Sequence, residues 1–361
     1  MDDLDDNLLY EILKRLPAKT VARFMIINKR FYSLISDPFF IVNHADYQSG
    51  KIASGFFHTS LNTGSIDHYS FDLSSPTQTI SLDLPEDHQT YRLCILATCN
   101  GLILLMSEPF CSNSIYLCNP TTKTNRCIPA PGSDNHMFGI GLAVNPMAFQ
   151  LHNHYKVVGL YRLPNCLTWQ FKIFTPDTGC WRYSKETISY NEKSYLYGGA
   201  VYFRGALHWL TNKGDILAFD VDKEQSWMIK IPRTITQLVS RRPWFSVTWF
   251  GVVEDQLNLI AVNHKGIVNW VLCDYENKKW EMKRRFKRIW GKDNTVWILP
   301  LPIFYDGDRL VLKVARPFSN GYPFINLHDL QIHNLRTGGV SGGKTLEHCK
   351  LIPDIGTLIR V

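Results

Sequence analysis

The first 45 residues carry apolar side chains at helical spacing in a segment too short to bury them all. Five of these side chains share one face of a first helix, because they recur with the helical period. They are Leu8, Leu9, Ile12, Leu13 and Leu16. Pro17 ends this helix, since the residue before a proline is pushed out of the helical conformation.

Two further short helices are predicted before residue 45. The second begins near Thr20, and the third contains Phe31, Leu34 and Ile35. Residues 36–38 (Ser-Asp-Pro) indicate a stop followed by a new turn. Three helices in about 40 residues bury only part of their apolar surface, so the remainder needs a partner. That partner is either another protein or the rest of this chain, in which case the helices are a structural cap.

Three fragments of this segment have a recognisable order: Ile12-Leu13, residues 15–19 (Arg-Leu-Pro-Ala-Lys) and residues 34–38 (Leu-Ile-Ser-Asp-Pro). From residue 4 to about 44 the chain resembles the F-box, which docks a protein onto the Skp-type adaptor of a cullin–RING ubiquitin ligase. Two places depart from the family pattern: Leu4-Asp5 replaces Leu-Pro, and residues 28–31 replace Cys-Lys-x-Trp. Phe31 can keep the apolar contact that the family's aromatic commonly makes with the adaptor. The departures concern the affinity for the adaptor and not the identity of the adaptor.

The resemblance implies that the helices bind the adaptor and, through it, a cullin scaffold. The side chains implied in that contact are Leu8, Ile12, Leu13, Leu16, Pro17, Val21, Phe24, Ile27 and Leu34.

Beyond residue 45 the pattern changes to short β-rich runs separated by Gly, Pro, Asn and Asp. One unit, a strand followed by a polar turn and a second strand, recurs with turns that begin at residues 72, 119, 175, 220, 274 and 334. The spacings of 47, 56, 45, 54 and 60 residues favour a propeller. We therefore expect an α+β protein with segregated domains: a three-helix unit over 1–45 and a β-propeller of six irregular four-stranded blades over 46–361. Residues 356–361 could complete the first blade.

Several fragments of the β region also occur in a characteristic order. They are residues 99–103 (Cys-Asn-Gly-Leu-Ile), 119–122 (Asn-Pro-Thr-Thr), 154–158 (His-Tyr-Lys-Val-Val), 205–210 (Gly-Ala-Leu-His-Trp-Leu) and 216–220 (Ile-Leu-Ala-Phe-Asp). From about 90 to 340 the chain resembles the F-box-associated domain of plant F-box proteins, a kelch-like interaction module. His154 replaces the usual acidic residue, and the resemblance thins after 290.

The net charge of +7 lies in the β region, because residues 1–45 carry six acidic and six basic side chains. Basic residues are densest from 278 to 292, where aromatic residues are interleaved with them. We predict that this segment and one loop aromatic bind an acidic or phosphorylated protein target. The predicted residues are Lys283, Arg284, Arg285, Arg288, Trp290 and Trp244. A solvated blade edge with Trp280 and Phe286 inward is favoured over target binding, and nucleic-acid binding is the least favoured alternative.

No motif predicts an enzyme, a cofactor or a metal. The nine cysteines form no Cys-x2-Cys pair, and His152 and His154 have no neighbouring cluster of ligands. No apolar run is long enough to span a membrane, and a basic and apolar leader is absent, so we expect the cytoplasm or the nucleus. The predicted function is a non-catalytic substrate receptor of a Skp–cullin–F-box ubiquitin ligase. The alternatives are a propeller scaffold outside any ligase and a propeller enzyme, each with a structural helical cap.

Overall fold

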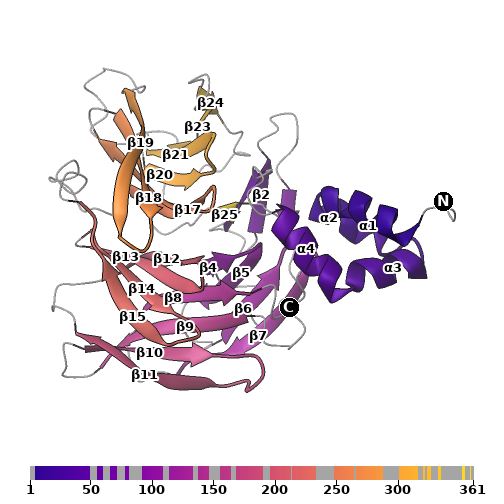
Figure 1. Cartoon of the computed structure of the whole chain (residues 1–361), viewed down its shortest axis with the longest axis horizontal. Helices are drawn as coiled ribbons and strands as arrows, with labels where there is room; N and C mark the ends of the chain where they lie inside the picture. Colours follow the sequence, from indigo (N-terminus) through magenta and orange to yellow (C-terminus); the bar gives the residue numbers. More distant parts are fainter. Residues whose placement is uncertain are drawn as a thin grey trace.

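The computed structural model describes most of the helical segment and the strands of the β region. The described residues are 5–48, 55–59, 66–70, 78–80, 92–108, 114–132, 137–145, 155–163, 168–189, 196–212, 214–232, 248–263, 266–287, 301–315, 320–321, 323–326, 332–334, 352–353 and 358. The helices project from one side of the β region, as Figure 1 shows.

The helical unit contains four helices, one more than predicted. They are α1 (Asp6–Arg15), α2 (Ala18–Phe24), α3 (Lys29–Ser36) and α4 (Pro38–Gln48). Residues 36–38 contain the predicted stop, because α3 ends at Ser36, and the turn that follows it is the start of α4 at Pro38. The Asp37 carboxylate accepts hydrogen bonds from the backbone N–H groups of Phe39 (2.8 Å) and Phe40 (3.3 Å), as a helix N-cap does. Pro38 occupies the first helical position, where its missing N–H has no consequence.

Helix α4 belongs to the same unit because its side chains cap α1. The last carbonyl groups of a helix have no partner within the helix. Here the Gln48 amide donates to the carbonyls of Leu16 (2.8 Å) and Lys14 (3.2 Å), and His44 Nε2 lies 2.9 Å from the same Leu16 oxygen. The helical unit therefore continues to Gln48.

The β region consists of antiparallel sheets, of which the described residues contain six. The first sheet has the order β25-β1-β2-β3. In each later sheet the strands lie side by side in their order along the chain, except that β22 pairs with β21 off this path. The first three sheets contain β1 (Gly55–Thr59), β2 (Ile66–Ser70), β3 (Gln78–Ile80) and β25 (Ile352–Pro353); β4 (Arg92–Cys99), β5 (Leu102–Glu108), β6 (Ser114–Asn119) and β7 (Thr124–Pro129); and β8 (Met137–Val144), β9 (Tyr155–Arg162), β10 (Thr168–Phe174) and β11 (Trp181–Ser189).

The remaining three sheets follow the same plan. They contain β12 (Leu196–Phe203), β13 (Ala206–Thr211), β14 (Ile216–Asp220) and β15 (Gln225–Ile229); β16 (Thr248–Val253), β17 (Gln256–Asn263), β18 (Gly266–Asp274) and β19 (Lys279–Lys287); and β20 (Leu301–Tyr305), β21 (Arg309–Ala315), β22 (Asn320–Gly321), β23 (Pro323–Asn326) and β24 (Ile332–Asn334).

The first strands of neighbouring sheets contact one another, which gives the propeller-like arrangement. Strand β8 lies against β4 and β12, and β16 lies against β12 and β20. The approach of β8 to β12 depends on two glycines: a Cβ at Gly139 would lie 2.7 Å from Leu196, and one at Gly141 would lie 2.8 Å from Ala200. The helical unit followed by a propeller-like β region confirms the predicted fold class. The number of blades stays a prediction.

A strand from the C-terminal region completes the first sheet. Ile352 and Pro353 in β25 pair with Phe57 and Phe56 in β1. The completion expected from residues 356–361 therefore comes from a slightly earlier segment. Of those six residues, Leu358 is the one that the structure describes, and it is buried.

The predicted turn positions mark one recurring backbone shape. After β6 and β14, the side-chain oxygens of Asn119 and Asp220 accept hydrogen bonds from the N–H groups two and three residues later. The residue four positions after the turn entry then has a positive φ, at Lys123 (57°), Glu224 (53°) and Lys278 (56°), and at a glycine after β10. The repeat at residues 119, 175, 220 and 274 is thus a repeat of turn geometry. Residue 72 lies outside the described residues.

The left-handed turn position predicts a stabilising substitution. Lys278→Gly should stabilise the protein by about 0.5–1 kcal/mol, because an L-residue is strained at positive φ and glycine is not. Gly179→Ala, at the equivalent turn with φ 65°, is the matched control and should lower the melting temperature. Thermal unfolding of both variants checks this, and a lower melting temperature for Lys278→Gly would contradict it.

A buried histidine joins two neighbouring sheets. His208 in β13 is fully buried, its Nε2 lies 2.7 Å from the Tyr275 hydroxyl, and its Nδ1 lies 3.3 Å from the Val201 carbonyl. Because a carbonyl only accepts, Nδ1 donates and the neutral ring accepts from Tyr275 at Nε2. Burial lowers the pKa of His208 from 6.5 to about 4.

This pKa predicts a loss of stability in acid. Between pH 6.5 and 4 the unfolded chain binds a proton at His208 that the folded chain does not, so stability falls as pH falls. The contribution is about 1.4 kcal/mol per pH unit across this window. Chemical unfolding at several pH values should show this slope reduced in His208→Gln. An equal slope in both proteins would refute the assignment.

Candidate functional site

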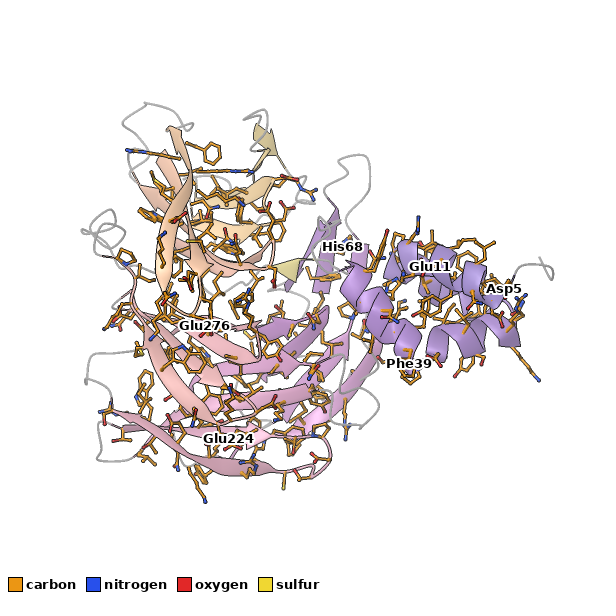
Figure 2. The ribbon with its side chains drawn as sticks, viewed as in Figure 1. Asp5, Glu11, Phe39, His68, Glu224 and Glu276 are labelled. Atoms are coloured by element: carbon orange, nitrogen blue, oxygen red, sulfur yellow. The ribbon has the colours of Figure 1, made fainter. Side chains whose placement is uncertain are left out.

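Exposed apolar side chains gather on the helical unit. Among the described residues, seven of the ten large apolar side chains that are exposed lie there. They are Leu8, Ile12, Ile26, Ile27, Tyr32, Phe39 and Tyr47. Phe39 lies on the outside of the unit, as Figure 2 shows. A concentration of exposed apolar surface in so small a unit indicates an interaction site.

The predicted adaptor contacts fall into three groups. Leu8, Ile12, Pro17 and Ile27 are exposed. Leu16, Phe24 and Leu34 are partly buried against the core of the helical unit. Leu13 and Val21 are in that core. In this structure Leu13 and Val21 stabilise the helical unit, and their side chains are not exposed to a partner.

The pitch of α1 explains this division. Leu9 and Leu13 lie four residues apart and face the core, whereas Leu8 and Ile12 precede each of them by one residue. One residue corresponds to about 100° around the helix, so the second pair lies on the exposed flank. Leu8 is 52% exposed, and Leu13 is 1% exposed.

Phe31 also faces inward, in contrast to the adaptor contact expected for this position. Its side chain is buried and stacks on Phe24 with ring centroids 5.5 Å apart. The Asn28 side chain caps α3 by accepting a hydrogen bond from the Phe31 N–H at 2.9 Å. The phenylalanine therefore anchors α3 against α2.

Charged side chains border the apolar surface and are engaged with one another. Lys14 pairs with Glu11 at 2.7 Å, and its ammonium lies 5.9 and 5.7 Å from the rings of Tyr10 and Tyr47. Arg30 pairs with Asp6 at 2.8 Å, which joins α3 to α1. These exposed pairs contribute little to stability, but they fix the outline of the apolar surface.

The predicted target surface centres on β19, the outer strand of its sheet. Lys283 pairs with Glu254, and Arg284 Nη1 donates to the Gly307 carbonyl at 2.9 Å. Arg285 is exposed and has no ion-pair partner within the described residues. Arg288, Trp290 and Trp244 lie outside the described residues.

Two features of β19 agree with the alternative of a solvated blade edge. Trp280 is buried between sheets, and Phe286 packs against a neighbouring apolar cluster. Lysine along an outer strand also prevents that edge from pairing with another strand. The basic segment thus has a structural role, and Arg285 is the predicted target residue whose charge the described part of the protein leaves unused.

The described residues contain no metal cluster, and two of their thiols are buried. No group of three or more His, Cys, Asp or Glu side chains could hold a metal ion among them, and His152 and His154 fall outside them. Burial raises the pKa of Cys99 and Cys118 to about 12, so these thiols stay protonated. None of the described helices combines the length and the apolar character needed to cross a bilayer.

Two family comparisons identify the parts of the chain. Residues 1–43 match the F-box domain, and residues 56–297 match the F-box associated beta propeller domain. The chain belongs to the F-box-associated β-propeller family. The F-box match ends within α4, and the propeller match covers the sheets from β1 to β19.

Similar proteins carry the F-box in their names, and one of them also carries kelch repeats. The F-box protein At1g20360 of Arabidopsis thaliana is 28% identical over 81% of this chain and 95% of its own length. The putative F-box/kelch-repeat protein At1g20940 of the same plant is 27% identical over 88% of this chain and 78% of its own length. Among solved structures, TolB from Acinetobacter baumannii overlaps with a TM-score of 0.47 at 10% identity, over 86% of this chain and 69% of that one. An overlap of that size carries no information on function.

The inward and outward positions of α1 predict different stability effects. Leu13→Ala should destabilise the F-box by about 2–5 kcal/mol, because it leaves a cavity. Leu8→Ala should change stability by about 0.5 kcal/mol or less, because the side chain is exposed. Chemical unfolding of the full chain measures both. Equal effects would show that the two leucines have the same environment.

Proposed function

We propose that this F-box protein is the substrate receptor of a Skp–cullin–F-box ubiquitin ligase. The observation that carries the proposal is the exposed apolar surface of the F-box, made by side chains such as Leu8, Ile12 and Ile27, beside a large propeller-like domain. A Skp-type adaptor would cover that surface and connect the chain to the cullin. Adaptor interfaces of this class bury roughly 1,200–2,000 Å² in total.

The proposed mechanism is proximity, and this chain makes or breaks no bond. The F-box fixes the protein to the ligase, while the β-propeller holds a target protein near the ubiquitin-charged conjugating enzyme. The target is a protein with an acidic or phosphorylated segment, and Arg285 is a candidate contact for it. Nucleic acid is less favoured, because Lys283 and Arg284 are engaged within the protein. The cytoplasmic or nuclear location expected from the sequence is part of the same proposal.

Adaptor binding tests the proposal directly. Co-purification of the full chain with a plant Skp-type adaptor should give a stoichiometric complex. Leu8→Ser combined with Ile12→Ser should weaken that complex at least about tenfold, because buried anchors dominate interface energy. Both positions are exposed in the free chain, so the F-box should stay folded.

The matched control is Met282→Ser, which removes an equally exposed apolar side chain from β19. Met282→Ser should bind the adaptor like the unmodified chain. If the folded full chain binds no adaptor, the helices are a structural cap and the protein is a scaffold or an enzyme. If both variants bind equally well, the adaptor uses another face.

A further inference from the structure

Lys172 in β10 is a buried cation with incomplete charge compensation. Its side chain is 8% exposed, and its Nζ donates to the Pro131 carbonyl at 2.7 Å. No carboxylate pairs with it among the described residues. Burying an ammonium group is costly unless an opposite charge accompanies it, so this position calls for an explanation.

Two tyrosines surround the ammonium group. Nζ lies 5.0 Å from the ring centroid of Tyr161 and 4.5 Å from that of Tyr183, so two aromatic faces supply part of the missing compensation. Tyr161 is 1% exposed, and its hydroxyl has no hydrogen-bond partner in the described part of the chain. Burial, with a smaller contribution from Tyr183, raises the pKa of Tyr161, so the hydroxyl keeps its proton and can donate it.

Strand register creates this arrangement. Lys172 pairs with Gly159 on one side and with Tyr183 on the other. The Tyr161 ring occupies the space above Gly159, where an added Cβ would lie 2.6 Å from it. The surface above Nζ is formed in part by Gly132, which is exposed and whose added Cβ would lie 3.8 Å from Nζ. The ammonium therefore lies just below the surface, where no side chain of Gly132 covers it.

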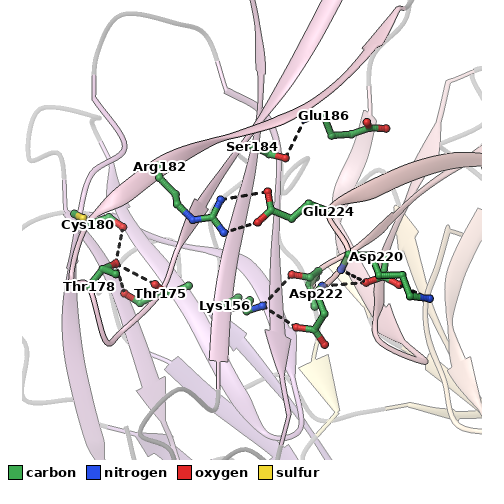
Figure 3. Close-up of polar contacts among 12 residues, drawn as sticks. Lys156, Thr175, Thr178, Cys180, Arg182, Ser184, Glu186, Asp220, Asp222 and Glu224 are labelled. Atoms are coloured by element: carbon green, nitrogen blue, oxygen red, sulfur yellow. Dashed lines mark hydrogen bonds and ion pairs between the residues drawn. The ribbon is translucent and has the colours of Figure 1, made fainter.

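Lys156 in β9 of the same sheet shows what full compensation looks like. Its Nζ also donates to a carbonyl of a neighbouring sheet, Val221 at 3.0 Å, and in addition pairs with the Asp222 carboxylate at 2.7 Å, as drawn in Figure 3. Its side chain is 22% exposed. Lys172 is more buried, yet within the described part of the chain it has the carbonyl without a carboxylate.

We propose that Lys172 and Tyr161 bind an oxyanion, either a carboxylate or a phosphate monoester, carried by a protein target. The ammonium supplies the charge and its remaining N–H donors, and the Tyr161 hydroxyl supplies a second donor. Binding would give the remaining Lys172 N–H groups and the Tyr161 hydroxyl an acceptor that the described residues do not supply. That the oxyanion belongs to a ligase target rests on the proposed function, whereas the binding of an oxyanion does not.

A purely structural role for Lys172 explains fewer of these observations. A lysine that only joined two sheets would need the Pro131 carbonyl, but it would not need a buried tyrosine hydroxyl to which the described residues offer no acceptor. The neighbouring contact at Lys156 shows that this sheet joins its neighbour with a complete ion pair. The site at Lys172 is therefore a binding site that is distinct from β19.

The test is titration of the full-length chain with inorganic phosphate and, separately, with acetate, followed by calorimetry at constant ionic strength. Saturable binding is expected, and the anion that binds more tightly distinguishes a phosphate source from a carboxylate source. Lys172→Met should weaken binding at least about tenfold, because it removes a charged donor. Tyr161→Phe, which removes one oxygen, should weaken it about threefold to tenfold. Lys156→Met, the matched control, should bind like the unmodified chain.

Asp134, two residues beyond Gly132 in the sequence, adds a further variant. Asp134 lies outside the described residues. The substitution Asp134→Asn removes the carboxylate that is nearest to Gly132 in the sequence. Binding that occurs only in Asp134→Asn would overturn the proposal, because the chain would then supply its own anion. Absence of saturable binding, or equal binding by Lys172→Met and Lys156→Met, would also overturn it. If Lys172→Met fails to fold, Tyr161→Phe decides alone. The outcome of adaptor co-purification does not depend on any of these results. The receptor proposal and the oxyanion proposal can therefore be refuted independently of each other.

Discussion

Close packing between the first strands of neighbouring sheets is the constraint on which the β region depends. Where β8 meets β12, the glycines at 139 and 141 remove the side chains that would hold the strands apart. The space gained lets Leu196, Leu207 and Trp209 join the third and fourth sheets in one apolar cluster. The outer strands need no such contact, and they carry the charges. The first strands therefore belong to the packed core, and an outer strand such as β19 forms the charged surface.

The F-box and the propeller-like domain differ in the kind of side chain that each leaves exposed or unpaired. One continuous apolar cluster includes F-box residues such as Leu13 and strand residues such as Leu102, so the two parts share a core. Yet the F-box leaves apolar side chains exposed, whereas β19 pairs most of its charges internally. In the proposed receptor role, apolar burial would hold the F-box on the ligase, and a few specific polar groups would remain for selective capture of a target.

Much of this fold follows from the sequence, and the exceptions have physical reasons. Helical period located α1 to α3, but a wide apolar stripe does not say which leucine faces inward, so Leu8 and Leu13 looked equivalent. Helix α4 was missed because its first residues, Phe39 to Val42, are apolar on every side and show no period. The turn repeat was visible because it depends on local side-chain hydrogen bonds. The surroundings of Lys172 were not, because Tyr161 and Tyr183 reach it through strand register.

The pairing of β25 with β1 has a consequence for how the chain is made. Phe56 and Phe57 leave the ribosome long before their partners Ile352 and Pro353. The contacts among the four helices are local in sequence, so the helices can form before β25 is made. During translation, therefore, the nascent protein has folded F-box helices followed by a sheet whose β1 edge is still open. Chaperone protection would be needed at that edge until the last strand arrives.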